Sequence, residues 1–425
     1  MRVSIMPGKI SGNIKAIPSK SHLHRLLILA ALADKETKLN CADTDAEDIK
    51  ATIDCLTALG AVVKRMDNGF VVTPINRKKM PRKCVLPCLE SGSTLRFMLP
   101  LVCALGIQGE FHMAGRLPKR PLAPFDDELS RHGIRLWWPN TNVLCCEGQL
   151  ASGDFILPGN VSSQYISGLL MALPELEEDS SVTVTGEVES SDYITMTKDA
   201  KALFKVSLTE SNGKYAILGE TRPRSPQIID VEGDWSNAAF WLCAGAMPGG
   251  DVKLGGLNKN SSQGDREICG ILEQMGAEVK WKDDILHVCA RERHGIVIDA
   301  REVPDLVPVL AAVASVSEGT TIVKNAARLR LKESDRLNAT TQTLNLLGAK
   351  VTEEASGLKI EGVKRLKGGT VDSFSDHRIA MMAAIASTAC ENPVVITNAQ
   401  AVNKSYPTFW KELSANGKNV VEEEK

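Results

Sequence analysis

The sequence predicts a two-domain α/β protein with mixed sheets, in which each domain is an inside-out α/β barrel of three βαβαββ repeats around buried parallel helices. Two series of helical segments, and the short β-branched runs between them, predict this fold. Each series has six members and recurs with a period of about 71 residues along the chain. Six repeats divide naturally into three for each domain.

The first series consists of segments that are apolar on nearly every helical face and begin with a small or acidic capping residue. A helix that is apolar all round must be buried among other elements, so these helices are expected inside the sheets. Pro100 is expected to kink the second of them, because proline removes a backbone donor. The six segments begin at Ser21, Ser93, Ser163, Ser236, Asp305 and Asp376.

The second series consists of amphipathic helices that each run into a turn and then a strand. Their polar faces indicate that they cover the outside of each repeat. Runs such as VVTPI, SVTVTG and PVVIT predict the strands. The third repeat lacks the turn glycine that the others have; the turn positions are Gly60, Gly133, Lys205, Gly276, Gly348 and Gly417.

The chain is expected to cross between its two domains near residues 14–20 and 222–234, the second of which contains prolines. The first strands have no repeat of their own and would complete the last one. The predicted domains are therefore residues 15–226, and residues 1–14 together with 227–425. Two lobes joined by a double crossing form a natural hinge.

Composition excludes several classes of function. Lys and Arg number 50 against 52 for Asp and Glu, and aromatic residues make up only 4%, so a nucleic-acid partner is not expected. The 11 cysteines show no metal-ligand spacing and predict free thiols. The apolar runs are too short for a membrane span, and the N-terminus has no targeting pattern. We therefore expect a cytoplasmic protein without membrane association.

Basic residues gather at the starts of the buried helices and in a few loops, although the net charge of the chain is only −2. The N-terminus of a helix attracts anions through its exposed N–H groups and its dipole. This distribution predicts a small ligand with several negative charges. The basic residues are Lys20, Arg25, Arg96, Arg120, Lys332, Arg336, Arg378 and Lys404.

Eight short motifs follow one another over essentially the whole chain. They are PSKSHLHR (18–25), SGSTLR (91–96), RLPKRP (116–121), SSQY (162–165), VPD (303–305), RLKESDR (330–336), DHRIAM (376–381) and NKSYP (403–407). In this combination the sequence resembles the 5-enolpyruvylshikimate-3-phosphate synthase family of enolpyruvyl transferases. The resemblance implies the same two-domain architecture, with buried helices in each domain.

The resemblance also implies the reaction. Members of that family transfer the enolpyruvyl group of phosphoenolpyruvate to the 5-hydroxyl of shikimate 3-phosphate, through a tetrahedral intermediate, and release phosphate. This step belongs to aromatic amino acid biosynthesis and is the target of glyphosate. It needs no metal and no organic cofactor. Nothing in the sequence suggests an obligate protein partner, so a monomer is expected.

Residue by residue, the resemblance implies two substrate sites. Shikimate 3-phosphate would be bound by Lys20, Ser21, Arg25, Ser162, Ser163, Gln164, Ser190, Asp305 and Lys332. Phosphoenolpyruvate would be bound by Lys20, Gly92, Arg120, Gln164, Arg336, Arg378 and Lys404. The planar fork of Arg25 suits a carboxylate, and the missing Cβ of Gly92 would let backbone approach phosphoenolpyruvate.

Three residues would carry the proton transfers. Asp305 is the expected base for the attacking hydroxyl, and Glu333 the expected acid for the methylene carbon. Lys20 could share either transfer, and the division among the three stays open. Structural alternatives also stay open: Asp305 could simply cap a helix, and RLKESDR could be a salt-bridged helix face.

The sequence departs from the family pattern at Glu90 and Arg328, where the family usually has Asn. An acid at position 90 could repel the substrate or could pair with a cation. The position of Arg328 leaves its contact with substrate in doubt.

Two rival functions fit less well. UDP-N-acetylglucosamine enolpyruvyl transferases have a loop cysteine and an Asn after the first Lys. Here loop 114–125 has no cysteine, and Ser21 follows Lys20. A repeat scaffold that only binds phosphorylated ligands would not require Asp305 and Glu333.

Overall fold

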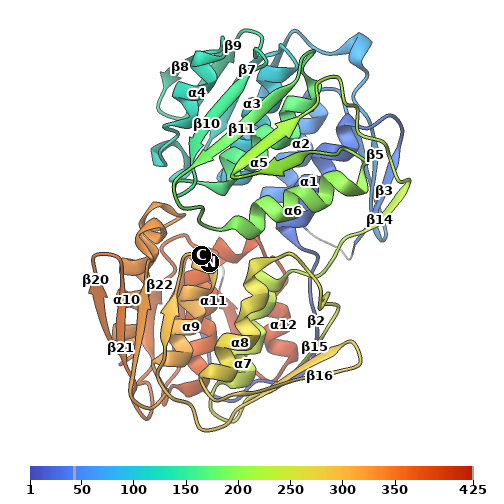
Figure 1. The fold of residues 1–425 in the computed structure, drawn as a ribbon. Helices are drawn as coiled ribbons and strands as arrows, with labels where there is room; N and C mark the ends of the chain where they lie inside the picture. Colours follow the sequence, from blue (N-terminus) through green and yellow to red (C-terminus); the bar gives the residue numbers. More distant parts are fainter. Residues whose placement is uncertain (42–44, 424–425) are drawn as a thin grey trace. The chain divides into compact units, whose positions relative to one another are not determined.

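The computed structural model describes residues 1–41 and 45–423. The chain divides into two compact units, Lys20–Val231, here the first unit, and Met1–Ser19 with Glu232–Lys425, here the second unit. Each unit contains three four-stranded sheets and its own buried core (Figure 1). Repeats of one kind therefore build both units.

The sheets of the first unit have the strand orders β14-β3-β5-β4, β6-β7-β9-β8 and β10-β11-β13-β12. Their strands are β3 (Thr37–Asn40), β4 (Val62–Met66), β5 (Gly69–Thr73), β6 (Lys83–Leu89), β7 (Gln108–Met113), β8 (Arg135–Asn140), β9 (Val143–Glu147), β10 (Asp154–Pro158), β11 (Ser180–Thr185), β12 (Thr209–Ser211), β13 (Lys214–Ile217) and β14 (Ile228–Asp230).

The sheets of the second unit have the strand orders β16-β17-β15-β2, β18-β19-β21-β20 and β22-β23-β1-β24. Their strands are β1 (Arg2–Ile5), β2 (Ser11–Lys15), β15 (Asp251–Gly255), β16 (Glu278–Lys282), β17 (Ile285–Cys289), β18 (Val297–Asp299), β19 (Thr320–Lys324), β20 (Lys350–Glu354), β21 (Gly357–Glu361), β22 (Gly369–Asp372), β23 (Val394–Thr397) and β24 (Val420–Glu423).

All six sheets share one pairing pattern, in which one parallel pair is extended by two antiparallel strands. In the second sheet, β6 runs parallel to β7, and β9 and β8 follow antiparallel. Helix α3 (Gly92–Ala104) connects β6 to β7, as a parallel crossover requires. This pattern is the predicted βαβαββ repeat.

The first and fourth repeats exchange their first strands. Strand β2 precedes the first helix in sequence but pairs with β15 of the second unit, Ile14 opposite Leu254. Strand β14 precedes the fourth buried helix but pairs with β3 of the first unit, Ile229 opposite Leu39. Strand β1 completes the last sheet, between β23 and β24. At both crossings, therefore, the last strand stays in the unit that the chain is leaving.

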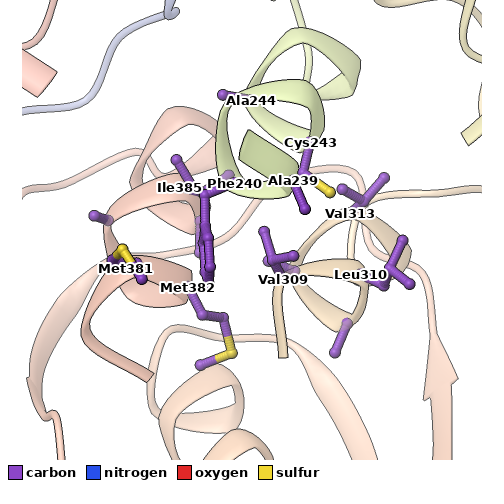
Figure 2. Packing of buried hydrophobic residues seen from close by; sticks show 14 of the residues in the cluster. Ala239, Phe240, Cys243, Ala244, Val309, Leu310, Val313, Met381, Met382 and Ile385 are labelled. Carbon is purple, nitrogen blue, oxygen red and sulfur yellow. The ribbon is translucent and has the colours of Figure 1, made fainter. Parts of the chain in front are cut away.

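Six buried helices line the two cores. They are α1 (Lys20–Leu32), α3 (Gly92–Ala104), α5 (Ser163–Ala172), α7 (Trp235–Ala246), α9 (Val307–Ala314) and α11 (His377–Ala386). In the second unit, the side chains of Phe240, Val309 and Met382 point toward one another between α7, α9 and α11 (Figure 2). Full burial of such a side chain contributes about 1.5–3 kcal/mol, so packing between these helices stabilises the unit.

Six amphipathic helices form the second series, as predicted. They are α2 (Glu47–Ala58), α4 (Phe125–Arg131), α6 (Ser191–Leu203), α8 (Ile268–Gln274), α10 (Arg336–Leu346) and α12 (Phe409–Ala415). The turn residue after each helix has a positive φ: 96° at Gly60, 89° at Gly133, 97° at Gly276, 96° at Gly348 and 98° at Gly417. Lys205 adopts 56° at the equivalent position and bears the strain of a left-handed residue with a Cβ.

The helix caps lie one or two residues earlier than predicted in three buried helices. The observed caps of α3, α5 and α7 are Ser91, Ser162 and Asp234. Asp376 caps α11, as predicted. Asp305 does not occupy the predicted cap position, because it lies within the 3₁₀ turn Pro304–Leu306, which has Val303 at its N-cap, and α9 has Leu306 at its N-cap.

Helices α3 and α5 approach closely because of a glycine. Helix α3 continues through Pro100, which gives no N–H to the Arg96 carbonyl. A Cβ on Gly168 of α5 would lie 2.4 Å from that carbonyl oxygen. Only glycine allows this contact, which sets the spacing of the two helix N-termini.

Other connections of the chain lie in short 3₁₀ turns: Arg77–Lys79, Leu117–Lys119, Leu173–Glu175, Gly264–Glu267, Ala327–Leu331, Ser387–Ala389 and Ala399–Lys404. All eleven cysteines are free, as expected from their spacing. Within residues 1–41 and 45–423, no helix combines the length and apolar character needed to cross a bilayer.

Candidate active site

The predicted site residues fall into two groups, one in each unit. The group of the first unit gathers at the N-termini of α1, α3, α5 and α6. The group of the second unit gathers around the start of α10, where the chain leaves a 3₁₀ turn. Each group is built below from its own unit.

Hydrogen bonds tie the start of α3 to the start of α5. Arg96 Nη1 donates to Gln164 Oε1 over 2.8 Å, and Gln164 Nε2 donates to Ser93 Oγ over 2.8 Å. Ser162 Oγ accepts from the Gln164 backbone N–H over 3.3 Å and caps α5. The predicted ligand residue Gln164 is thus held in place by both helices, and Ser163 is buried beside it.

Two guanidinium groups flank Gly92. A Cβ on Gly92 would lie 2.7 Å from Arg96 Nη1 and 2.8 Å from Arg120 Nη1. The loop that carries Arg120 is fixed by Tyr165, whose hydroxyl donates to the Pro121 carbonyl over 2.7 Å. Glycine at this position therefore leaves room for two cations next to the N-terminal amides of a helix, which is an arrangement suited to an anion.

Arg25 is a buried cation that donates only to neutral groups. Its side chain donates to Thr197 Oγ1, to the Ser21 carbonyl and to the Tyr193 carbonyl over 2.7, 2.7 and 2.9 Å. Burial lowers the pKa of Arg25 to about 10. In the part of the chain that the structure describes, no carboxylate pairs with it. A buried, uncompensated charge of this kind indicates a place for an anionic ligand.

Lys20 begins α1 and pairs with a carboxylate that the sequence analysis missed. Lys20 Nζ lies 2.6 Å from Asp48 Oδ2, and the side chains are 19% and 8% exposed. Asp48 lies in the first turn of α2, where acidic residues commonly stabilise a helix. Its sequence context therefore looked like ordinary helix chemistry, and only the fold shows that it meets Lys20.

Ser190 lies immediately before α6 in a strained conformation. Its φ and ψ are 55° and 46°, the left-handed region, and its side chain is buried. A non-glycine residue in this region costs of order 1–3 kcal/mol. The fold therefore holds Ser190 in a conformation that the chain would not adopt alone.

Arg336 is the centre of the second group. Its guanidinium contacts three carboxylates: Asp305 Oδ1 at 2.6 Å, Glu333 Oε2 at 2.6 Å and Asp376 Oδ2 at 2.8 Å. Arg336 is 1% exposed and Asp376 is fully buried. Burial opposes the charge of Arg336, but the three carboxylates raise its pKa above the ordinary value. The strongest sequence motif is thus a buried ion cluster and not a solvated helix face.

Asp305 lies among three cations. Its carboxylate is 2.6 Å from Arg336, 3.3 Å from Arg378 and 3.4 Å from Lys332. Burial alone would raise the pKa of Asp305, but Arg378, Lys332 and Arg336 together hold it well below the ordinary value. Asp305 is therefore ionised. Burial lowers the pKa of Lys332, and Asp305 opposes that change.

Arg378 connects this cluster to the start of α7. Its Nη1 donates to the Asp305 carbonyl over 3.0 Å, and its Nη2 donates to Ser236 Oγ over 2.7 Å. Lys404 is buried at the end of the turn Ala399–Lys404. All the residues predicted for the second unit are thus inward-facing or partly buried.

The sequence analysis also missed Asp265. Burial, and then the negative charge of Asp305, raise the pKa of Asp265 to about 7, while Arg378 and Ser236 oppose the shift. Its segment, QGDRE, resembles any polar turn, and no signal in the sequence distinguishes it. A buried carboxyl group with such a pKa is a frequent feature of functional sites.

The two departures from the family pattern have structural explanations. The Glu90 carboxylate fills the space that a Cβ of Gly115 would occupy, and Gly115 has a φ of 54°. Glu90 is therefore packed against the loop that carries Arg120. Arg328 Nη2 donates to the Arg301 carbonyl over 3.1 Å. Its guanidinium thus binds the backbone of its own unit.

Within the described residues, no group of three or more His, Cys, Asp or Glu side chains is arranged to hold a metal ion. The chemistry of both groups is that of cations, carboxylates, hydroxyls and helix N-termini. Together with the six-repeat fold, they define an α/β enzyme that acts on small anionic substrates.

Comparison with known proteins identifies the family. The family model of EPSP synthase (3-phosphoshikimate 1-carboxyvinyltransferase) matches residues 5–413. The 3-phosphoshikimate 1-carboxyvinyltransferases of Clostridium kluyveri and Clostridium acetobutylicum are each 42% identical to this chain, over 99% of it and 98% of their own length. The chain belongs to the EPSP synthase family.

Solved structures agree with this assignment. EPSP synthase from Acinetobacter baumannii has a TM-score of 0.81 at 25% identity, over 99% of this chain and 100% of the other. The enolpyruvyl transferase NikO from Streptomyces tendae has a TM-score of 0.78 at 16% identity, over 99% of this chain and 98% of the other, and supports the fold alone.

Proposed function

We propose that this enzyme transfers the enolpyruvyl group of phosphoenolpyruvate to the 5-hydroxyl of shikimate 3-phosphate and releases phosphate, as a step of aromatic amino acid biosynthesis. Family membership supports the reaction. The observation that carries the assignment of residues is the position of Asp305, a carboxylate within 3.4 Å of Lys332, Arg336 and Arg378. Such a carboxylate can act as a base only where an anionic ligand competes for its cations.

The shikimate 3-phosphate site is assigned to the residues that the family resemblance implies. Arg25 supports it best, because a buried guanidinium whose protein partners are neutral suits the carboxylate of a ligand. The hydroxyls at the starts of α5 and α6 suit its phosphate. The full assignment is Lys20, Ser21, Arg25, Ser162, Ser163, Gln164, Ser190, Asp305 and Lys332.

The phosphoenolpyruvate site is also assigned to the residues that the family resemblance implies. Gly92 supports it, because the missing Cβ lets two guanidiniums approach the start of α3, where they can bind an anion. The two substrates together bring about five to six negative charges, so several fixed cations are needed to hold them side by side. The full assignment is Lys20, Gly92, Arg120, Gln164, Arg336, Arg378 and Lys404.

Binding exchanges the partners of the cations. In the structure, Arg336 and Arg378 neutralise carboxylates of their own unit. The phosphate and carboxylate of phosphoenolpyruvate offer these cations new partners. As the cations move toward the ligand, the pKa of Asp305 rises, and Asp305 becomes able to accept the proton of the 5-hydroxyl. Glu333 loses the same partner, Arg336, in this exchange.

Addition and elimination then use the same two carboxyl groups. In the addition, the 5-oxygen bonds to C2 of phosphoenolpyruvate, Glu333 gives a proton to C3, and Asp305 takes the hydroxyl proton. In the elimination, Glu333 takes a proton back from C3, the bond between C2 and the phosphate oxygen breaks, and phosphate leaves with the proton from Asp305. Lys20, held by Asp48, can stabilise the charge that develops on the phosphate.

Three further statements belong to this proposal. The chain crosses between its lobes near residues 14–20 and 222–234, as predicted from the sequence. The enzyme works as a monomer. It acts in the cytoplasm, and the eleven free thiols support this location, since a reducing compartment preserves them. It needs neither a metal nor an organic cofactor.

An assay of phosphate release with two alternative acceptors tests this function. We expect phosphate release from phosphoenolpyruvate to require shikimate 3-phosphate and to continue after exhaustive treatment with a chelator. The nucleotide sugar UDP-N-acetylglucosamine serves as the alternative acceptor. Turnover with the nucleotide sugar, or loss of activity on chelation, would contradict the proposal.

A further inference from the structure

A chain of hydroxyl groups connects three helices inside the first unit. His24 Nδ1 of α1 lies 2.7 Å from Thr52 Oγ1 of α2, and Thr52 Oγ1 lies 2.7 Å from Thr94 Oγ1 of α3. Thr94 Oγ1 donates to Ser91 Oγ, the cap of α3, over 2.7 Å. Every member is at most 1% exposed, so water does not compete for these bonds.

Hydrogen-bond donation along this chain of side chains has one favourable direction. Burial lowers the pKa of His24 to about 3, so the imidazole is neutral and carries one N–H. Its Nε2 is buried and has no hydrogen-bond partner among the described residues. A buried donor without an acceptor is more costly than a buried lone pair, so the proton belongs on Nδ1. His24 then donates to Thr52, Thr52 to Thr94, and Thr94 to Ser91.

This chain of hydrogen bonds ends beside Gly92, which is assigned to phosphoenolpyruvate. Ser91 Oγ accepts from both the hydroxyl and the backbone N–H of Thr94, and thereby fixes the first turn of α3, which begins at Gly92. Thr52 lies on α2 one turn after Asp48. Asp48 in turn holds Lys20. Two ligand residues from different helices, Lys20 and Gly92, are thus connected through α2 and the hydrogen bonds of Thr52 and Thr94.

We propose that His24, Thr52, Thr94 and Ser91 form a positioning relay that fixes the start of α3 relative to Lys20, and that this relay determines the affinity for phosphoenolpyruvate. The inference rests on the proposed assignment of Lys20 and Gly92 to that substrate. None of the four relay residues is assigned to a ligand. The relay acts through geometry, because small displacements of preorganised groups weaken their contacts with a bound anion.

Thr52 is the residue to change, because Thr52→Val keeps the shape of the side chain and removes only its hydroxyl. We expect the KM for phosphoenolpyruvate to rise ~10-fold, the scale of one lost buried hydrogen bond, while kcat and the KM for shikimate 3-phosphate change less than ~3-fold. Thr52→Ser should restore the affinity, because the hydroxyl returns. A change that only destabilised the fold would not raise the KM for phosphoenolpyruvate while leaving the KM for shikimate 3-phosphate nearly unchanged.

Thr37→Val is the matched control. Thr37 is also fully buried in the first unit, and its hydroxyl donates to Ser225 Oγ over 2.8 Å, but it lies in β3, outside the relay. We expect it to leave both KM values unchanged. The inference is wrong if Thr52→Val leaves the KM for phosphoenolpyruvate unchanged, if both KM values rise equally, or if Thr37→Val has the same effect.

Amide hydrogen exchange tests the relay without turnover. Thr52→Val should speed exchange at the Thr94 amide, which bonds Ser91 Oγ, by ~10-fold, while amides in the middle of α3 keep their protection. Unchanged exchange at Thr94 would overturn the relay even if the enzyme were active. If the wild-type enzyme shows no turnover, the proposed function is contradicted. The exchange rate at Thr94 then decides alone whether the relay exists.

Discussion

Asp305→Asn and Glu333→Gln should each lower kcat by roughly 10²–10⁴-fold, the usual effect of removing a positioned acid or base. The amides keep the size of the side chains but cannot exchange a proton. Affinity for the two substrates should change much less, because neither carboxylate neutralises ligand charge. Steady-state kinetics with phosphoenolpyruvate and shikimate 3-phosphate measures both quantities.

Glu175→Gln is the matched control for these variants. Glu175 is a mostly buried carboxylate that pairs with Arg77 at 2.6 Å, so its change also removes a charge from an ion pair. We expect kcat to stay within about 3-fold of the unchanged enzyme, because the pair lies at the C-terminal end of α1 and contacts no assigned ligand residue. If Asp305→Asn or Glu333→Gln keeps near-normal turnover, that residue is only a member of the ion cluster.

Arg336→Met should lower the free energy of unfolding by about 3–5 kcal/mol at neutral pH and lower turnover at least ~100-fold. The change leaves Asp305, Glu333 and the buried Asp376 without their shared cation, and an uncompensated buried charge is strongly destabilising. It also removes a cation assigned to phosphoenolpyruvate. Urea unfolding and steady-state kinetics measure the two effects.

The effect of Arg336→Met on stability should depend on pH in a direction that identifies its cause. In the unchanged protein the pKa of Asp305 is lowered, so its contribution to stability is present above its ordinary pKa and is lost as the pH falls through the lowered value. Without Arg336, protonation relieves the uncompensated carboxylates. The difference between the two proteins should therefore shrink as the pH falls from ~7 to below the ordinary pKa of Asp, 3.8.

Arg330→Met is the control for Arg336→Met. Arg330 also contacts two carboxylates, Asp335 at 3.0 Å and Glu353 at 2.6 Å, but its side chain is 29% exposed. We expect a loss of at most about 1 kcal/mol, because solvent screens such a pair. An equal loss in the two variants would show that burial does not decide the strength of the Arg336 cluster.

The repeats could be predicted from the sequence because their signals are local. The apolar helices are apolar at almost every position, and the turn residues at Gly60, Gly133 and Gly276 adopt the positive φ that glycine tolerates best. Both signals recur at a fixed spacing, so a single unclear member such as Lys205 does not hide the pattern. The observed helix caps lie one or two residues from the predicted positions, because Ser, Thr and Asp near a helix start are equally good candidates.

The features that the sequence did not reveal depend on distant partners. The exchange of β2 and β14 is decided by pairing with β15 and β3, far away in the chain. Asp48 and Asp265 lie in ordinary polar segments, and their importance follows from meeting Lys20 and Asp305 in space. The ligand residues themselves were assigned by resemblance, because spacing alone does not distinguish a salt-bridged surface from a substrate site.

The most direct test of the proposed addition and elimination is to follow the oxygen that bridges C2 and phosphorus in phosphoenolpyruvate into the products. The enzyme would be supplied with shikimate 3-phosphate and with phosphoenolpyruvate labelled with ¹⁸O at this bridging position, in the presence of a chelator. If Asp305 and Glu333 act as proposed, the bond between C2 and this oxygen breaks, and mass spectrometry finds the label in the released phosphate. Label retained on the three-carbon product would mean that the bond to phosphorus breaks instead, which would contradict enolpyruvyl transfer by these residues.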